Sequence, residues 1–280
     1  MNEINEIKDK IIKFYNDDLT SGNLRATSAV GNYLTCFLKN FIKTDGLEIF
    51  FFSGAKTGTR SILKSLYDAS YTICSHHRIG SFYHENKIDK KQFTIFDLIK
   101  YSCNFRIPVI LDIYRDNLER TISSFFEFQY NFYKDKSIEE LINIFLSGNN
   151  NWDQRLINLE MYEGSDEIVK YYNIKFDKFD FDKKYCLIQQ SGIIFLKLRF
   201  KDLYMFDKIW YNLFNKKIDI NYENQSCKKD YHDKYIQFLD KITITRDYYN
   251  KMINNENFLI FNSDKEIEEY KKKWEKKIKD

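Results

Sequence analysis

The chain has 280 residues, of which 43% are hydrophobic and 30% charged, and its 44 basic and 41 acidic residues give a formal net charge of +3. This length and apolar content predict one sizeable folded domain and argue against disorder. The near balance of charge gives no sign of nucleic-acid binding, so an anion site would have to be local.

The amino-terminal stretch carries acids and amides where a signal peptide needs a basic segment followed by an apolar one. No apolar run approaches the roughly 20 residues that a membrane-spanning helix needs. The sequence therefore predicts a cytoplasmic protein without a transmembrane segment and leaves peripheral contact with a membrane open. The five cysteines are odd in number and form no CxxC pair, which favours reduced core thiols over disulfides or a zinc site.

Along the first 114 residues, helical and strand patterns alternate. Apolar periodicity predicts two helices, at 4–15 and 28–41, that pack on the core. The run LEIFFF at 47–52 is typical of a buried strand, and TRSILKSLYDAS, with Thr59 or Ser61 as its cap, is typical of a helix. YTICS predicts a second strand, TIFDLIKYS a short helix, and PVILDIY, at 108–114, a third strand. This order favours a parallel sheet with right-handed crossovers and helices on both faces.

The second half of the chain is mainly helical. Apolar spacing predicts helices at 117–133, 138–146 and 152–162, and then two strands, 185–190 and 193–200, joined by a hairpin turn at Ser191-Gly192. The segments KDLYMFDKIWYNLF and KEIEEYKKKWEKKIKD are also helical in period.

These elements predict an α/β fold. We expect a central parallel sheet with a P-loop-type strand, loop and helix, helices on both faces and a helical carboxy-terminal extension. Residues 1–46 would form a helical segment packed on the core, and residues 47–280 would form a single domain.

The loop SGAKTGTR, from Ser53 to Arg60, lies between the first strand and the following helix. The start of a helix offers free N–H groups and a partial positive charge, which suit an anion. A Walker A loop would have Lys directly after the second glycine and then Ser or Thr to hold Mg²⁺, but Thr59 and Arg60 occupy those places. Lys56 instead precedes Gly58 by two residues, which disfavours ordinary ATP chemistry. An ordinary turn with a solvated lysine is the alternative.

This loop resembles the 5′-phosphosulfate-binding loop of the P-loop sulfotransferase family, which Lys56, Thr57, Gly58 and Thr59 match position by position. The resemblance implies that loop amides and Thr hydroxyls hold the 5′-phosphate of 3′-phosphoadenylyl sulfate (PAPS). It also implies that Lys56 reaches the oxygen that bridges phosphate and sulfuryl. Because a transferring sulfuryl group carries less charge than a phosphoryl group, one ammonium and a helix N-terminus can replace a Mg²⁺ clamp.

The segment after the third strand resembles the 3′-phosphate motif of the same family, an Arg at the strand end followed by a Ser on the next helix. Arg115 and Ser123 are eight positions apart (123 − 115 = 8). An Arg fork suits a dianionic phosphate, and the strand end lies at the sheet edge where ligands bind. Asn117 departs from the family, which often has Pro there. An ordinary strand-helix junction, with Arg115 in a surface ion pair, is the alternative.

Three later stretches resemble the bacterial branch of the family that is named for capsular polysaccharide synthesis. They are NWDQRLINLEMYEG, IIFLKLRFKDL and the carboxy-terminal helical region, so the likeness covers most of the chain after residue 47. The resemblance implies a sulfotransferase that moves a sulfuryl group from PAPS to a hydroxyl of a capsular or other cell-surface glycan or its precursor. No metal and no nucleic acid are expected to take part.

Two other functions remain open. One is a P-loop nucleotide kinase or NTPase, in which Asp112 would hold Mg²⁺, and the other is a non-catalytic glycan-assembly protein with the same fold. On the sulfotransferase interpretation, the donor-binding residues are Gly54, Ala55, Lys56, Thr57, Gly58, Thr59, Arg60, Arg115 and Ser123.

The acceptor hydroxyl needs a base near neutral pH, for which His is the best side chain and Glu the next. His76 and His77 follow the second strand, at the same sheet edge as both loops, so they join Lys56 as candidate catalytic residues. A loop histidine without a catalytic role is the alternative. Glu85 and Glu127 are the next candidates for the base, and the resemblance does not choose among the four.

Overall fold

The computed structural model describes residues 5–13, 41, 43–44, 46–54, 56–76, 93–147, 165–220 and 229–279. The first predicted helix is confirmed at residues 5–13. The helix predicted at 152–162 and nearly all of the one predicted at 28–41 lie outside the described residues. Within them, no helix is long and apolar enough to cross a membrane.

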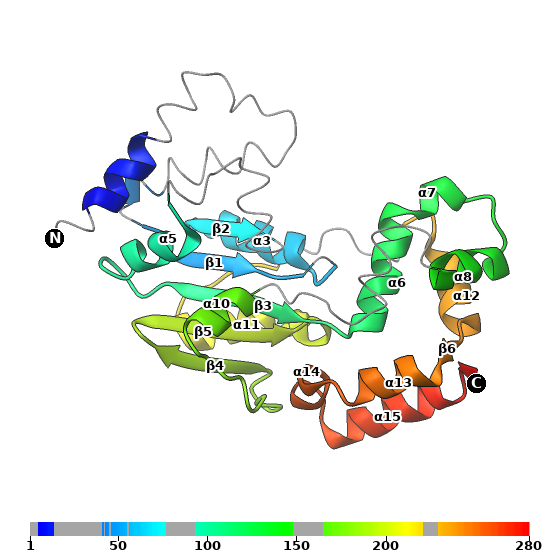
Figure 1. The fold of residues 1–280 in the computed structure, drawn as a ribbon. Coiled ribbons are helices and arrows are strands. Elements are labelled where there is room, and N and C mark those ends of the chain that lie inside the picture. The colour runs from blue at the N-terminus through cyan, green and yellow to red at the C-terminus, as the bar shows by residue number, and fades with distance from the viewer. Residues whose placement is uncertain are drawn as a thin grey trace.

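A five-stranded sheet forms the centre of the fold (Figure 1). Its order is β2-β1-β3-β5-β4, and the first four of these strands run parallel to one another. The strands are β1 (Ile49–Phe52), β2 (Ile73–His76), β3 (Val109–Tyr114), β4 (Tyr185–Gln190) and β5 (Ile193–Arg199).

The predicted hairpin between β4 and β5 is confirmed, and it makes the sheet mixed instead of parallel throughout. Ser191 and Gly192 form the turn, with φ of 54° and 74°. Two consecutive residues with positive φ are typical of a type I′ hairpin turn, and such a turn joins antiparallel strands. Strand β4 accordingly pairs antiparallel with β5 at the sheet edge.

Helices cover both faces of the sheet, as predicted. Alternate residues of a strand point to opposite faces, so Phe50 and Phe52 belong to one apolar cluster while Ile49 and Phe51 belong to the other. The first cluster includes residues from the helix at 5–13, α5 (Ile95–Ser102) and α10 (Asp166–Tyr171). The second includes residues from α3 (Thr59–Asp68), the 3₁₀ helix η1 (Phe200–Met205) and α11 (Phe206–Phe214).

The remaining helices form a group beside the sheet, shown on the right of Figure 1. An aromatic-rich cluster that includes Phe125, Phe126, Phe238 and Trp274 holds this group together. Its elements are α6 (Asn117–Phe128), α7 (Tyr130–Tyr133), α8 (Ile138–Ser147), α12 (His232–Lys241), α13 (Arg246–Ile253), α14 (Glu256–Ile260), α15 (Asp264–Glu275) and the paired strands β6 (Ile244–Thr245) and β7 (Ile278–Lys279). Because α6 continues directly from β3, the group lies at the carboxyl ends of the parallel strands.

Candidate functional site

The loop between β1 and α3 is closed by its own hydroxyl groups. The buried Thr57 hydroxyl donates to the Gly54 carbonyl at 2.7 Å and lies 2.6 Å from the Ser53 hydroxyl. Gly58 is the residue that caps α3, and it makes no side-chain cap bond. The prediction that Thr59 or Ser61 caps the helix is therefore wrong, and the first-turn amides of α3 keep their capacity to bind an anion.

Side chains from other elements lie close beside both glycines of the loop, and the positive φ of Gly58 also disfavours any other residue there. A Cβ atom at Gly54 would lie 2.2 Å from the Nη1 atom of Arg120. At Gly58, where φ is +82°, a Cβ atom would lie 2.6 Å from Cδ1 of Leu203. The loop is thus held against α6 on one side and against η1 on the other.

The loops that follow β1 and β3 meet directly. The Nη1 atom of Arg115 donates to the Lys56 carbonyl at 2.7 Å, across 59 positions of sequence. The Arg115 guanidinium also lies 4.1 Å from the centre of the Phe200 ring, a cation–π contact. Its Nε atom is buried and donates no hydrogen bond within the described residues. Lys56 itself has φ of 65°, an uncommon conformation for a residue with a side chain.

Helix α6 brings Glu127 to the same loop. The Oε2 atom of Glu127 lies 3.3 Å from Nζ of Lys56 and 3.6 Å from Nζ of Lys229, and it accepts a hydrogen bond from the Tyr231 hydroxyl at 2.8 Å. Ser123 is four residues before Glu127, so it lies one turn earlier on the same face of α6. This face is the one directed at the Lys56 loop.

The ionisable groups around Lys56 make the site cationic. Burial lowers the pKa of Lys56, Glu127 acts in the opposite direction, and the charges of Lys229 and Arg115 lower the pKa further. Burial, together with Glu127, raises the pKa of Tyr231. Burial and the nearby Glu119 carboxylate also raise the pKa of Asp116, which caps α6, to about 6. A buried ammonium among other cations favours the arrival of an anion.

The other predicted site residues lie around this centre. Thr59 is buried, and its hydroxyl lies 3.2 Å from that of Thr57. Arg60 is exposed in the first turn of α3. His76 is the last residue of β2 and pairs in register with Phe52, the last residue of β1. Ala55, His77 and Glu85 lie outside the described residues.

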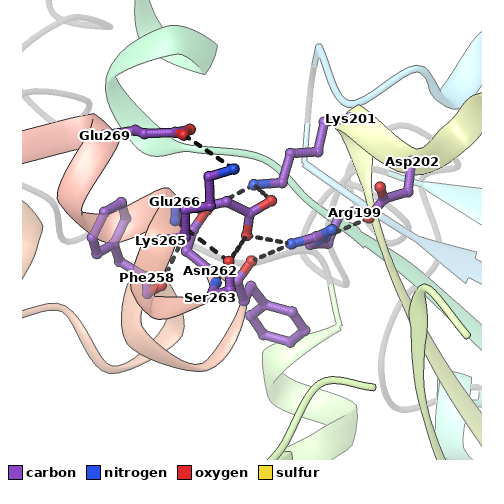
Figure 2. A network of polar contacts seen from close by, with 10 residues as sticks. Arg199, Lys201, Asp202, Phe258, Asn262, Ser263, Lys265, Glu266 and Glu269 are labelled. Carbon is purple, nitrogen blue, oxygen red and sulfur yellow. Dashed lines mark hydrogen bonds and ion pairs between the residues drawn. The ribbon is translucent and has the colours of Figure 1, made fainter. Parts of the chain in front are cut away.

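A network at the end of β5 holds η1 against the site (Figure 2). The buried Arg199 side chain bonds to Asp202, to Oε2 of Glu266 at 2.9 Å and to the Phe261 carbonyl at 3.2 Å. Lys201 lies 2.9 Å from Oε1 of Glu266. Because Phe200 of η1 contacts Arg115 and Leu203 of η1 lies beside Gly58, this network connects α15 to the loops that follow β1 and β3.

We expect Glu266 to make the free energy of unfolding depend on pH in the acid range. Burial alone would raise the pKa of Glu266, but bonds from Lys201 and the Ser263 N–H, with the Arg199 charge, hold the pKa at about 2. Its stabilising effect is therefore present above the ordinary value of 4.5 and is lost as pH falls toward 2. With allowance for partial solvent screening, the free energy of unfolding should fall by about 1–2 kcal/mol over this range through Glu266 alone.

Urea unfolding of the wild type and of Glu266→Gln between pH 5 and pH 2.5 measures this contribution. The curves should converge as pH falls. Glu269→Gln, on the same helix with a 3.9 Å pair to Lys265, is the matched control and should run parallel to the wild type. A constant gap between wild type and Glu266→Gln would show that the Glu266 charge does not stabilise the fold.

Other site residues were not predicted from the sequence. Lys229, Tyr231 and Phe200 lie about 140 to 175 positions from Lys56 along the chain, and none stands in a motif that signals chemistry. The abundance of lysine and tyrosine hides such residues, since a typical one is a solvated or packing residue.

Comparison with known proteins adds no family to these observations. No family model, curated protein or solved structure matches the chain at a significant level. Across the described part of the chain, no group of three or more His, Cys, Asp or Glu side chains is placed to hold a metal ion. The contacts between the loops after β1 and β3 are therefore the basis for a functional proposal.

Proposed function

We propose that this chain is a sulfotransferase that moves a sulfuryl group from PAPS to a hydroxyl of a glycan. The observation that carries the proposal is the 2.7 Å hydrogen bond from Arg115 to the Lys56 carbonyl. This bond joins Arg115, which resembles the 3′-phosphate-binding residue of the family, to the loop that resembles its 5′-phosphosulfate-binding loop. One nucleotide with phosphates at both positions fits such a pair of adjoining sites.

The described residues suit the two anionic ends of this donor. The Lys56 ammonium, which pairs with Glu127 in the free protein, and the first-turn amides of α3 are suited to the 5′ end. The buried Nε atom of Arg115 has no hydrogen-bond acceptor among the described residues and can donate to the 3′-phosphate. Ser123 lies on the face of α6 that is directed at the loop. When bound, the donor supplies the activated sulfuryl group, and Lys56 stabilises the charge that develops on the leaving oxygen.

The surroundings of Asp112 favour this proposal over a kinase or NTPase. Asp112 is buried in the middle of β3, where its Oδ2 atom accepts a hydrogen bond from Ser165 at 2.8 Å and pairs with Lys197 at 3.5 Å. A carboxylate already neutralised by a buried lysine is a poor equivalent of the Mg²⁺-binding acid on a P-loop strand.

The acceptor class and the catalytic base complete the proposal. The glycan class, a capsular or other cell-surface polysaccharide or its precursor, comes from the sequence resemblance. His76 supports a role as base by its position, since it ends β2 beside Phe52 at the edge where the donor loops lie. No metal is proposed for the reaction.

Discrimination between two nucleotides tests the donor. The bisphosphate product, 3′-phosphoadenosine 5′-phosphate, should raise the melting temperature far more than AMP does, because Arg115 and Ser123 are proposed to read the 3′-phosphate. At 100 times Kd, a ligand specific for the folded state stabilises it by about 2.7 kcal/mol. In Arg115→Gln the two nucleotides should give similar small shifts in a thermal scan.

ADP serves as the control nucleotide, with and without Mg²⁺. A kinase or NTPase would be stabilised most by ADP with Mg²⁺, whereas the proposed sulfotransferase should prefer the bisphosphate with or without the metal. Equal shifts from AMP and the bisphosphate in the wild type would rule out PAPS as the donor.

A further inference from the structure

Two ammonium groups and one phenol hydroxyl, from two segments far apart in the sequence, contact a single oxygen atom. Lys56 of the β1–α3 loop, together with Lys229 and Tyr231 just before α12, all contact the Oε2 atom of Glu127, at 3.3, 3.6 and 2.8 Å. The side chains of Lys56 and Glu127 are only 14% and 17% exposed. Glu127 itself comes from α6, so the cluster joins the sheet edge to the helical group.

These three side chains form a binding site for an anionic oxygen. Two ammonium groups and a phenol hydroxyl, which here surround a carboxylate oxygen, can equally donate to an oxygen of a sulfate or phosphate. The two lysines and Glu127 together carry a net charge of +1 (2 − 1 = 1). Arg115, which also lowers the pKa of Lys56, adds another positive charge beside them. The site can therefore hold more negative charge than Glu127 supplies.

We propose that the Glu127 carboxylate competes with PAPS for the same ligands, and that Lys229 and Tyr231 bind PAPS. In the free protein, Lys56, Lys229 and Tyr231 bind Glu127 Oε2. In the complex they release it and bind an anionic oxygen at the 5′ end of the nucleotide. This inference rests on the proposed function, to which it adds two ligands and a control of affinity.

Such a competitor has two physical effects. It keeps the partly buried Lys56 ammonium paired when no nucleotide is bound, since an unpaired buried charge is costly. It also weakens nucleotide binding, because the bonds to Glu127 must be broken first, and so it helps the product to leave.

Glu127 is also a candidate for the base that accepts the proton of the acceptor hydroxyl, but its contacts disfavour that role. Its Oε2 atom already accepts from Tyr231 and lies against two ammonium groups, so this oxygen has little capacity left for the proton of an acceptor hydroxyl. The two roles predict different results for Glu127→Gln: a competitor gives tighter binding when its charge is removed, whereas a base gives slower turnover with unchanged binding.

Calorimetric titration of the bisphosphate and of AMP at constant ionic strength tests the inference. Glu127→Gln should bind both nucleotides about tenfold more tightly than the wild type, because the competing charge is removed and the hydrogen-bonding shape remains. AMP is included because it has a 5′-phosphate without the 3′-phosphate. Glu119→Gln removes the same charge from the same helix about two turns earlier, where Glu119 lies 3.7 Å from Lys273, and should leave both affinities within about twofold of the wild type.

Lys229→Met, made alone and together with Glu127→Gln, tests the second half of the inference. If Lys229 binds the nucleotide, Lys229→Met should weaken binding about tenfold in both backgrounds. If Lys229 only neutralises Glu127, the loss should vanish in the double variant, which would overturn its assignment as a donor ligand. Melting temperatures of all variants verify that each is folded.

The outcomes separate this inference from the proposed function. Unchanged affinities in Glu127→Gln, or an equal gain in Glu119→Gln, would overturn the competitor even where the wild type prefers the bisphosphate to AMP. Tighter binding of both nucleotides in Glu127→Gln, with no preference for the bisphosphate in the wild type, would instead support the anion site and overturn PAPS as the donor.

Discussion

Replacing Lys56 by alanine is expected to lower turnover of PAPS about 10²- to 10³-fold, with a much smaller loss of bisphosphate affinity. The ammonium is proposed to act on negative charge that grows on the bridging oxygen as the sulfur–oxygen bond breaks. The bisphosphate no longer carries the sulfuryl group, so its binding draws on Arg115, Ser123 and the loop amides as well. The rate of bisphosphate release from PAPS and a calorimetric Kd measure the two effects.

Lys56→Gly is the matched variant for the same position. It removes the same ammonium, so its turnover should be as low as that of Lys56→Ala. Lys56 has φ of 65°, which glycine adopts without penalty, so Lys56→Gly should be more stable than Lys56→Ala by about 1 kcal/mol. Urea unfolding gives the difference. Near-normal turnover in either variant would remove Lys56 from the mechanism.

Replacing Arg199 by methionine is expected to destabilise the fold by about 3–5 kcal/mol. Arg199 bonds to Asp202, which is only 5% exposed, and also to Glu266 and the Phe261 carbonyl. Without the guanidinium, the Asp202 carboxylate stays buried and loses its partner Arg199, and the end of β5 loses its bond to Glu266 of α15. The free energy of unfolding in urea measures the loss.

Lys201→Met is the control for Arg199→Met in the same network. The Lys201 side chain is 44% exposed, so its pair with Glu266 should contribute no more than about 1 kcal/mol. Combining Arg199→Met with Asp202→Leu should recover part of the loss, because the buried unpaired charge is then absent. A loss below 1 kcal/mol in Arg199→Met alone would contradict the structural role of the network.

The elements nearest the candidate site could be predicted from local sequence patterns. The runs that became β1 and β3 are almost continuously apolar, which is how strands buried on both faces appear. Ser191-Gly192 predicted the hairpin, although the antiparallel β4 was not carried into the prediction of a parallel sheet. The helix predicted at 117–133 is divided between α6 and α7 at Gln129, which the periodicity did not indicate.

The sequence also predicted that the loops after β1 and β3 would share an edge of the sheet. Lys56 and Arg115 each follow a strand of a parallel pair, and the carboxyl ends of such strands meet at one edge. Their hydrogen bond agrees with that expectation.

Strand order along the chain, apolar period and loop composition were thus determined by the sequence itself, because they depend on residues a few positions apart. Only the tertiary structure decided which side chains distant in sequence contact one another. Lys229 and Tyr231 contact Glu127, and Glu266 bonds to Arg199. Tyr231 and Glu127 are 104 positions apart, and Glu266 and Arg199 are 67 apart. Such pairs form when the apolar faces of α6, α12 and α15 pack together, and that packing depends on the shape of the whole helical group beside the sheet.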